Sequence, residues 1–338
     1  MDGWFNRWFN QQWQSIGLAH VVLMPLSWLF GAVSAARRWL YQHQYLRSYR
    51  LSVPVIVVGN ISVGGTGKTP LVIYLAKQLK QMGYTPGVIS RGYGGKNVGE
   101  VTANSNASEF GDEPVLIAKR STCPVWVNPH RIAAGRALLQ AHPECNVIIS
   151  DDGLQHYRLQ RSVEIAMVDS EHSFGNECLL PAGPLREKIA RLQTVDAIVD
   201  SGQVTDFKYN FPPIFSMQLQ GNMFESVNGS KSQQLANYFA NKNIVAIAGI
   251  GNPARFFQHL SNLGLQFERA AFDDHYAFSA QDFVSLANKT ILMTEKDAVK
   301  CKSFALMDAW YLPVKAQISG EINIKLIEII QKKLKTPD

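Results

Sequence analysis

The stretch Ser62-Val63-Gly64-Gly65-Thr66-Gly67-Lys68-Thr69 lies between the apolar run 55–58 and a segment with helical apolar spacing that begins near residue 70. A strand, a glycine-rich turn and a helix in this order are typical of a phosphate-binding P-loop. Glycines let backbone N–H groups converge on phosphate oxygens, and the helix N-terminus adds positive potential. These eight residues therefore predict a nucleoside triphosphate site, although Ser62 stands where the general pattern has glycine. A chance glycine-rich turn is the alternative.

Two further features extend this prediction to phosphoryl transfer. In a P-loop, Lys68 would reach the β- and γ-phosphates, and the Thr69 hydroxyl would ligate Mg²⁺. Asp151 and Asp152 follow the apolar run 147–149, and the C-terminal ends of parallel strands are where open α/β sheets bind ligands. We expect the two carboxylates to hold Mg²⁺, with an ordinary Asp-Gly turn as the alternative.

Polar residues elsewhere in the chain can complete such a site. Arg91 begins the glycine-rich loop 91–96 and suits a phosphate-bearing ligand, although a mobile loop has the same composition. Asp112 is a candidate general base or a simple helix N-terminal acid. Glu187, beside Arg186, is a candidate metal neighbour or half of a surface ion pair. His275 adjoins carboxylates and can orient a base, or it can be a structural histidine.

The composition bounds the class of protein. The 338 residues are 46% hydrophobic and 18% charged, which is typical of a globular chain with one large or two medium domains. The four cysteines are far apart and form no Cys-x-x-Cys pair, which argues against a disulfide scaffold or a cysteine zinc site. The net charge is +6, and its excess gathers beside an apolar segment rather than on an aromatic-studded face, so nucleic acid is not an expected partner.

That apolar segment is 16–36, which contains no Asp, Glu, Lys or Arg and is followed by Arg37 and Arg38. Tryptophans flank it, and aromatic residues with adjacent arginines suit the headgroup zone of an anionic leaflet. We expect monotopic membrane association, with a helix buried in the protein and a true span as alternatives. A cleaved signal peptide is disfavoured because a P-loop enzyme needs cytoplasmic nucleotide.

Short apolar runs alternate with helical segments along the chain and predict an α/β fold. We expect a P-loop NTPase-like, mostly parallel sheet flanked by helices, an N-terminal hydrophobic helix, and a second, smaller α/β domain. The expected boundaries are 1–45 for the membrane-associating segment, 46–205 for the P-loop domain and 206–338 for the second domain, which is expected to end in an amphipathic helix. The expected strands are 54–58, 86–89, 125–127, 147–149, 165–168, 197–199, 244–250, 291–293 and 310–312.

Eight strings of this chain, in order, resemble the tetraacyldisaccharide 4′-kinases of lipid A biosynthesis in Gram-negative bacteria. These strings are VGNISVGGTGKTP (58–70), SRGYGG (90–95), GDEP (111–114), SDDGLQHYRL (150–159), LLPAGPLRE (179–187), AGIGNPARFF (248–257), FDDHY (272–276) and TEKDAVK (294–300). Together they are far more specific than any one motif. They also include Ser62 within the family's own version of the P-loop.

The resemblance implies transfer of the γ-phosphoryl of ATP to the 4′-hydroxyl of a tetraacyldisaccharide 1-phosphate. It implies Asp112 and His275 as the catalytic pair, with Lys68, Arg91 and Mg²⁺ stabilising the phosphates. The family's N-terminal segment lies against the cytoplasmic face of the inner membrane, and its smaller domain closes over the site. No obligate protein partner is expected.

Two other readings of the residues stay open. One is a different P-loop NTPase, although the guanine-specific N-K-x-D string is missing its Asp at Asn241-Lys242-Asn243-Ile244. The other is a membrane-bound nucleotide switch that needs no disaccharide acceptor. Transfer of label from ATP to the lipid separates the kinase from both alternatives.

Overall fold

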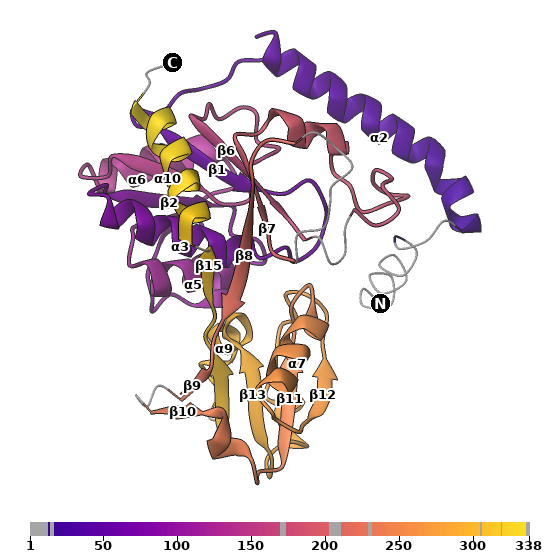
Figure 1. Cartoon of the computed structure of the whole chain (residues 1–338), viewed down its shortest axis with the longest axis vertical. Helices are drawn as coiled ribbons and strands as arrows, with labels where there is room; N and C mark the ends of the chain where they lie inside the picture. The colour runs from indigo at the N-terminus through magenta and orange to yellow at the C-terminus, as the bar shows by residue number, and fades with distance from the viewer. Residues whose placement is uncertain are drawn as a thin grey trace.

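The structure is a computed structural model that describes Trp13 and residues 17–169, 174–202, 211–228, 232–304, 306–318 and 320–335. Residues 1–12 and 14–16 of the expected membrane-associating segment lie outside this part of the chain. The described chain forms two sheets with helices packed on them (Figure 1).

The larger sheet has nine strands and carries the P-loop. Its seven central strands, from β8 to β4, are parallel, and an antiparallel strand closes each edge. In spatial order the strands are β15 (Lys315–Ile318), β8 (Ile214–Gln220), β7 (Ala197–Asp200), β6 (Val163–Val168), β1 (Val55–Gly59), β5 (Val147–Ser150), β2 (Pro86–Ser90), β4 (Val125–Val127) and β3 (Gly99–Val101).

Strand β1 is fully buried because helices cover both faces of this sheet. Ile56 and Val58 pack into the core on one face, which holds residues of α3 (Lys68–Gln81), α5 (Asp112–Ser121) and α10 (Gly320–Lys335). Val55 and Val57 pack into the opposite core, with α6 (Arg131–Ala141) and η1 (Ile189–Thr194). A short helix, α4 (Ala107–Phe110), precedes α5. Burial on both faces explains the uninterrupted apolar run in the sequence.

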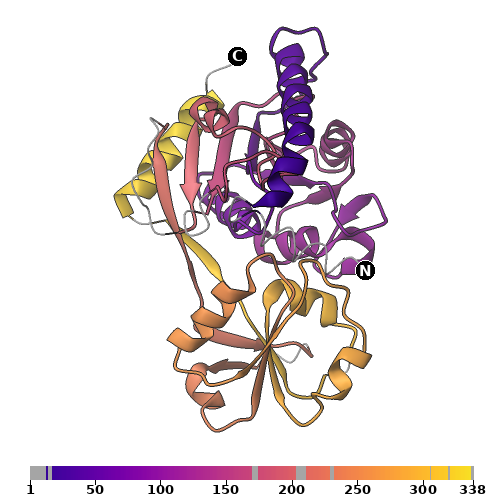
Figure 2. The same ribbon diagram turned by 90° about the vertical axis from the view of Figure 1, so that its right-hand side faces the viewer.

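The smaller sheet has six strands and its own two apolar cores. In spatial order these strands are β10 (Gln233–Leu235), β9 (Met223–Ser226), β14 (Ala309–Leu312), β13 (Thr290–Thr294), β11 (Ile244–Ala248) and β12 (Glu268–Ala271). The accompanying helices are η2 (Ala236–Phe239), α7 (Pro253–Asn262), α8 (Gln281–Val284) and α9 (Glu295–Cys301). The two sheets lie end to end, as Figures 1 and 2 show from perpendicular directions.

The expected fold class, and each strand expected from an apolar run, are confirmed. The expected boundary at 205/206 does not separate the two sheets. Strands β8 and β15 lie in the nine-stranded sheet, and Leu326 and Ile330 of α10 are buried in its core. The chain therefore enters the smaller unit after β8 and returns before β15. A lone strand at the edge and a C-terminal amphipathic helix carry no signal of which sheet they join.

Helix α2 (Leu18–Gln42) lies along the outer flank of the larger unit (Figure 1). It is long and apolar enough to cross a membrane, with 11% of its apolar window buried. His20, Ser27 and Gly31 face the protein, where the Ser27 hydroxyl donates to the Leu179 carbonyl at 2.8 Å. The expected alternative of a buried helix is therefore wrong, because the apolar side chains face outward.

Candidate active site between the two sheets

The P-loop joins β1 to α3 in the predicted order. Gly67 caps the helix with φ +88°, and Gly64 has φ +117°, conformations that favour glycine. Lys68 is nearly buried, and its ammonium donates to the Asn60 side-chain oxygen at 3.2 Å and lies 3.5 Å from an Asp152 oxygen. A positive group held at the helix N-terminus suits an anionic ligand.

Asp151 and Asp152 follow β5 at the same edge of the sheet. Burial raises the pKa of Asp151 to about 7, with Glu113 and Asp152 adding to the shift, and its Oδ1 is buried without a hydrogen-bond partner. Burial also acts to raise the pKa of Asp152, but Lys68 and Arg186 outweigh it and lower that pKa. Arg186 lies 3.1 Å from Asp152, whose backbone has φ +46°. The two neighbouring carboxylates thus have opposite electrostatic environments.

Glu187, expected near the metal, has other partners. Its carboxylate accepts from Gln155 at 2.9 Å and from the Tyr157 hydroxyl, and it lies 4.0 Å from Arg191. No three His, Cys, Asp or Glu side chains gather as a metal site within the described residues. The structure therefore does not bring Glu187 together with Asp151 and Asp152. The sequence did not indicate that Glu187 would lie apart from the two aspartates. Its neighbour Arg186 pairs with Asp152, whereas Glu187 itself pairs with Gln155 and Tyr157.

Asp112 and His275, one from each unit, are in direct contact. His275 Nδ1 lies 3.1 Å from both carboxylate oxygens of Asp112, which is buried at the start of α5. Burial acts to raise the pKa of Asp112, but the hydrogen bond from His275 and the charge of Lys296 outweigh it and lower that pKa. Burial acts to lower the pKa of His275, but the bond to Asp112 and nearby carboxylates raise it. His275 has φ +59°, a strained conformation of the kind found at functional sites.

Four residues to which sequence reasoning gave no role of their own surround this pair: Lys296, Glu113, Asp274 and Tyr93. Lys296 Nζ lies 3.3 Å from His275 Nε2, 3.3 Å from an Asp274 oxygen and 3.1 Å from a Glu113 oxygen. The Tyr93 ring lies 4.8 Å from the His275 ring. Lys296 belongs to the TEKDAVK string, which was the only indication in the sequence that this lysine could be a site residue. Its contact across the two units follows only from the tertiary fold.

Arg91 follows β2 on the P-loop side of the sheet, as expected. It is exposed and lines a pocket of about 230 Å³ together with the loop 92–98 and Pro129. Tyr93, which contacts His275, lies in the same loop. The pocket therefore adjoins the Asp112–His275 pair.

The two units meet at glycines. A Cβ on Gly251 would lie 2.4 Å from the Gly65 nitrogen, and a Cβ on Gly65 would lie 3.2 Å from the Gly251 Cα. Gly251 belongs to the loop between β11 and α7, so the smaller unit contacts the P-loop directly. Only glycine permits this approach.

Comparison with known proteins identifies the family of this site. Residues 19–335 match the family model described as tetraacyldisaccharide-1-P 4'-kinase, LpxK. The chain belongs to the tetraacyldisaccharide-1-P 4'-kinase family. It is 47% identical over 328 residues to the tetraacyldisaccharide 4'-kinase of Methylobacillus flagellatus, covering 96% of each chain. It is 48% identical over 322 residues to that of Pasteurella multocida, covering 93% of this chain and 94% of the other.

A solved member of the LpxK family has the same fold. The crystal structure of LpxK from Aquifex aeolicus, described as the "apo" form in complex with ATP, superposes with a TM-score of 0.79 at 31% identity. The match covers 94% of this chain and 100% of that one. The expected family resemblance and kinase class are therefore confirmed.

Proposed function

We propose that this LpxK-family kinase transfers the γ-phosphoryl of ATP to the 4′-hydroxyl of tetraacyldisaccharide 1-phosphate. The observation that carries the proposal is the Asp112–His275 contact at the junction where the P-loop meets the smaller unit. The P-loop supplies the donor site, and the pair supplies a proton acceptor. The names of the curated relatives supply the identity of the acceptor lipid.

Asp112 is proposed as the general base, because a sugar hydroxyl is a weak nucleophile until its proton is removed. Asp112 Oδ1 already accepts from the Glu113 backbone N–H at 2.8 Å, whereas among the described residues Oδ2 accepts only the hydrogen bond that it shares with His275. Oδ2 is therefore the oxygen with capacity for the acceptor hydroxyl. The hydroxyl oxygen bonds to the γ-phosphorus as its proton passes to Oδ2, and ADP leaves with the electrons of the broken P–O bond.

His275 is proposed to orient this carboxylate. With its proton on Nδ1 toward Asp112, Nε2 is free to accept from Lys296. Lys296 in turn bonds Asp274 and Glu113, so the imidazole is held from both sides. Lys68 is proposed to contact the transferred phosphate, and Arg91 to contribute positive charge from the adjacent loop.

Thr69, Asp151 and Asp152 are proposed to hold Mg²⁺, and their environment fits a cation. Asp151 has a buried oxygen without a partner and a raised pKa, a combination that a divalent ion would relieve. Asp152 stays ionised beside Lys68 and Arg186. When bound, Mg²⁺ neutralises charge on the phosphates. Glu187 is left out of this set because its carboxylate is engaged by Tyr157 and Gln155.

The enzyme is proposed to act at the cytoplasmic face of the inner membrane, on a lipid that stays in the bilayer. Val22, Leu26, Leu29 and Val33 form one face of α2, and each is more than half exposed. The opposite face packs on the protein, so α2 is oriented to lie in the interface rather than to span it. This geometry would place the active site between the two units at the depth of the lipid headgroups. The six-stranded unit is proposed as the domain that closes over the site.

The proposal is tested with γ-labelled ATP, Mg²⁺ and the lipid disaccharide monophosphate in detergent micelles. Label is expected in the lipid with wild-type protein, and at a rate lower by at least about a hundredfold with Asp112→Asn. Protein that binds ATP yet leaves the lipid unlabelled would contradict the proposal.

A further inference from the structure

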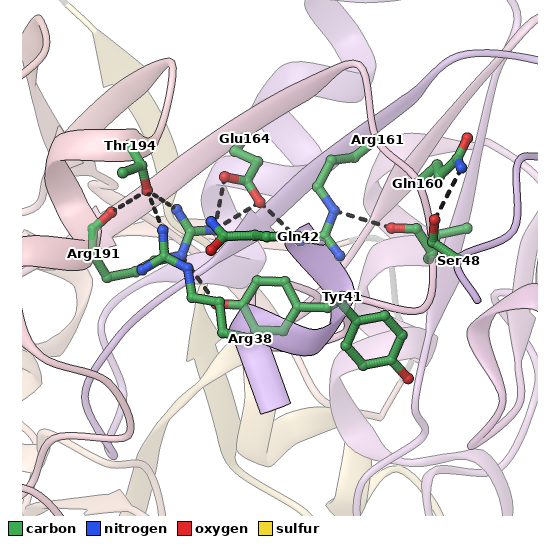
Figure 3. A pocket seen from close by; sticks show the side chains of 11 residues that line it. Arg38, Tyr41, Gln42, Ser48, Gln160, Arg161, Glu164, Arg191 and Thr194 are labelled. Atoms are coloured by element: carbon green, nitrogen blue, oxygen red, sulfur yellow. Dashed lines mark hydrogen bonds and ion pairs between the residues drawn. The ribbon is translucent and has the colours of Figure 1, made fainter. Parts of the chain in front are cut away.

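A second cavity, of about 430 Å³, lies under the C-terminal end of α2 (Figure 3). Arg38 and Tyr41 of α2 line it on one side, and Arg161, Glu164 and Arg191 line it on the other. Glu164 is the second residue of β6, whose neighbour β1 runs parallel to it toward the P-loop. The cavity lies where these parallel strands begin, and the P-loop lies where they end. The two sites are therefore at opposite ends of the strands.

The cavity carries an excess of positive charge. Three arginines line it against one carboxylate, that of Glu164. Arg191 donates to both Glu164 oxygens at 2.7 Å, and Arg161 donates to Glu164 at 2.8 Å. Arg161 and Arg191 thus share the Glu164 carboxylate, and Arg191 also lies 4.0 Å from Glu187, whereas the described residues supply no carboxylate within ion-pair distance of Arg38.

Of the three arginines that line the cavity, Arg38 uses the fewest of its donors toward the described residues. Arg161 also donates to the carbonyls of Leu154, His156 and Leu159, and Arg191 also donates to Tyr157 and Thr194. A guanidinium has five N–H donors, and within the described part of the chain Arg38 uses one, from Nη2 to the Thr194 hydroxyl at 3.0 Å. Its Nε is buried and has no hydrogen-bond partner. A buried donor without an acceptor is costly, which points to an acceptor supplied from outside the chain.

The position of Arg38 near the end of α2 indicates which kind of acceptor it would meet. The apolar face of α2 ends at Val33, about one and a half turns before Arg38, and the exposed Trp39 follows Arg38. Arginine and tryptophan at the end of an interfacial helix lie at the depth of lipid phosphates. Arginine also matches a phosphate group bidentately, better than lysine does.

We propose that this cavity binds the phosphate headgroup of an anionic bilayer lipid, with Arg38 as the direct contact. The inference rests on the membrane association in the proposed function. The acceptor lipid is not the expected occupant, because its 4′-hydroxyl has to reach the P-loop at the opposite edge of the sheet. The site thus holds the enzyme on the membrane apart from the lipid that it phosphorylates.

The test compares Arg38→Ala with Arg37→Ala in full-length protein. Arg37 is the neighbouring exposed arginine, stacks over Tyr41 at 5.8 Å, and does not line the cavity. Binding is measured by sedimentation with vesicles of phosphatidylcholine, with and without about a third phosphatidylglycerol. Loss of one surface charge is expected to weaken binding to the anionic vesicles about fivefold for Arg37→Ala. Loss of a charge-assisted contact is expected to weaken it roughly tenfold to a hundredfold for Arg38→Ala.

Two further arms identify the ligand. Arg38→Lys keeps the charge but not the planar fork, so it is expected to recover only part of the loss. Inorganic phosphate is added as a competitor at constant ionic strength and is expected to displace wild-type protein toward the level of Arg38→Ala while leaving Arg38→Ala unchanged; equal displacement of both proteins, or wild-type binding that does not depend on phosphatidylglycerol, overturns the lipid assignment. Equal weakening by Arg37→Ala and Arg38→Ala, or full recovery with Arg38→Lys, also overturns the proposal. Wild-type transfer of label in detergent micelles reports on the proposed function separately.

Discussion

His275 Nδ1 lies 3.1 Å from both carboxylate oxygens of Asp112, although the two residues are 163 positions apart in the chain. They come from different units, so the contact exists only when the smaller unit rests against the larger one. The proposed catalytic pair therefore depends on how the two units are placed against each other.

Removing the base should affect the chemical step rather than nucleotide binding. Asp112→Asn keeps the shape of the side chain, and we expect turnover to fall by about 10²–10⁴ because proton removal is lost. His275→Asn keeps a donor toward Asp112 and should lose less, roughly tenfold. The affinity for ATP should change less than about twofold in both variants, as measured by calorimetric titration. A matching loss of ATP affinity would mean that the pair supports the P-loop instead.

His275 should make stability depend on pH in a defined direction. Burial and the charge of Lys296 act to lower its pKa in the folded protein, but the hydrogen bond to Asp112 and the charges of Asp112 and Asp274 outweigh them and raise it, with the Tyr93 ring packed alongside. The stabilisation from its charged form is therefore full below the unfolded pKa of about 6.5 and is lost as the pH rises through the folded pKa. We expect the melting temperature of wild type to exceed that of His275→Asn by more at about pH 6 than at about pH 9. A difference that does not vary with pH would contradict the assignment.

Substitution of Thr69 should change the Mg²⁺ requirement of the enzyme, whereas substitution of Glu187 should not. Thr69→Ala removes the proposed hydroxyl ligand, so half-maximal activity should require roughly tenfold more Mg²⁺, whereas Thr69→Ser should behave as wild type. Glu187→Gln should leave the Mg²⁺ requirement unchanged, because its partners are Gln155, Tyr157 and Arg191. Magnesium titrations of ATPase or kinase activity check this. An increased Mg²⁺ requirement in Glu187→Gln would restore it as a metal neighbour.

The close approach of Gly251 to the P-loop should not tolerate a side chain. In Gly251→Ala the new Cβ would meet backbone at 2.4 Å, so the units must separate and the Asp112–His275 contact should open. We expect a loss of turnover of roughly a hundredfold, approaching that of Asp112→Asn. Gly65→Ala meets its neighbour at 3.2 Å and should be milder in this respect. Wild-type turnover in Gly251→Ala would show that catalysis does not need this approach.

The outward face of α2 should contribute to membrane binding and not to folding. Replacing Val22, Leu29 and Val33 with glutamine removes roughly 1 kcal/mol of apolar transfer at each position and should weaken vesicle binding about a hundredfold. The melting temperature should stay within a degree or so of wild type. Ser27→Ala is the matched control on the inward face: it loses bonds to Leu179 and Ala182 and should lower stability by about 1–2 kcal/mol. Destabilisation by the outward-face variant would argue that this face packs on protein.

The sequence predicted those parts of the fold in which one local pattern has one structural outcome. Apolar runs such as 55–58 and 147–149 became central parallel strands, and the glycine-rich octet became the P-loop, because both patterns depend on neighbouring residues alone. The return of β15 and α10 to the first sheet was not predictable, since an amphipathic helix does not specify its partner. The contact of Lys296 with His275 was not predictable either, because the local sequence shows Lys296 only as part of a polar cluster. Nor were the partners of Glu187, since Tyr157 and Arg191 had been assigned no role at the site. Local chemistry identifies candidate groups, and tertiary contacts decide which of them meet.

The most direct test of the account is transfer of the γ-phosphoryl from labelled ATP to the lipid disaccharide monophosphate by wild type and Asp112→Asn at equal ATP occupancy. The account predicts labelled lipid bisphosphate with wild type and a rate lower by at least about a hundredfold with Asp112→Asn. Equal rates for the two proteins, or unlabelled lipid with ATP-bound wild type, would contradict it.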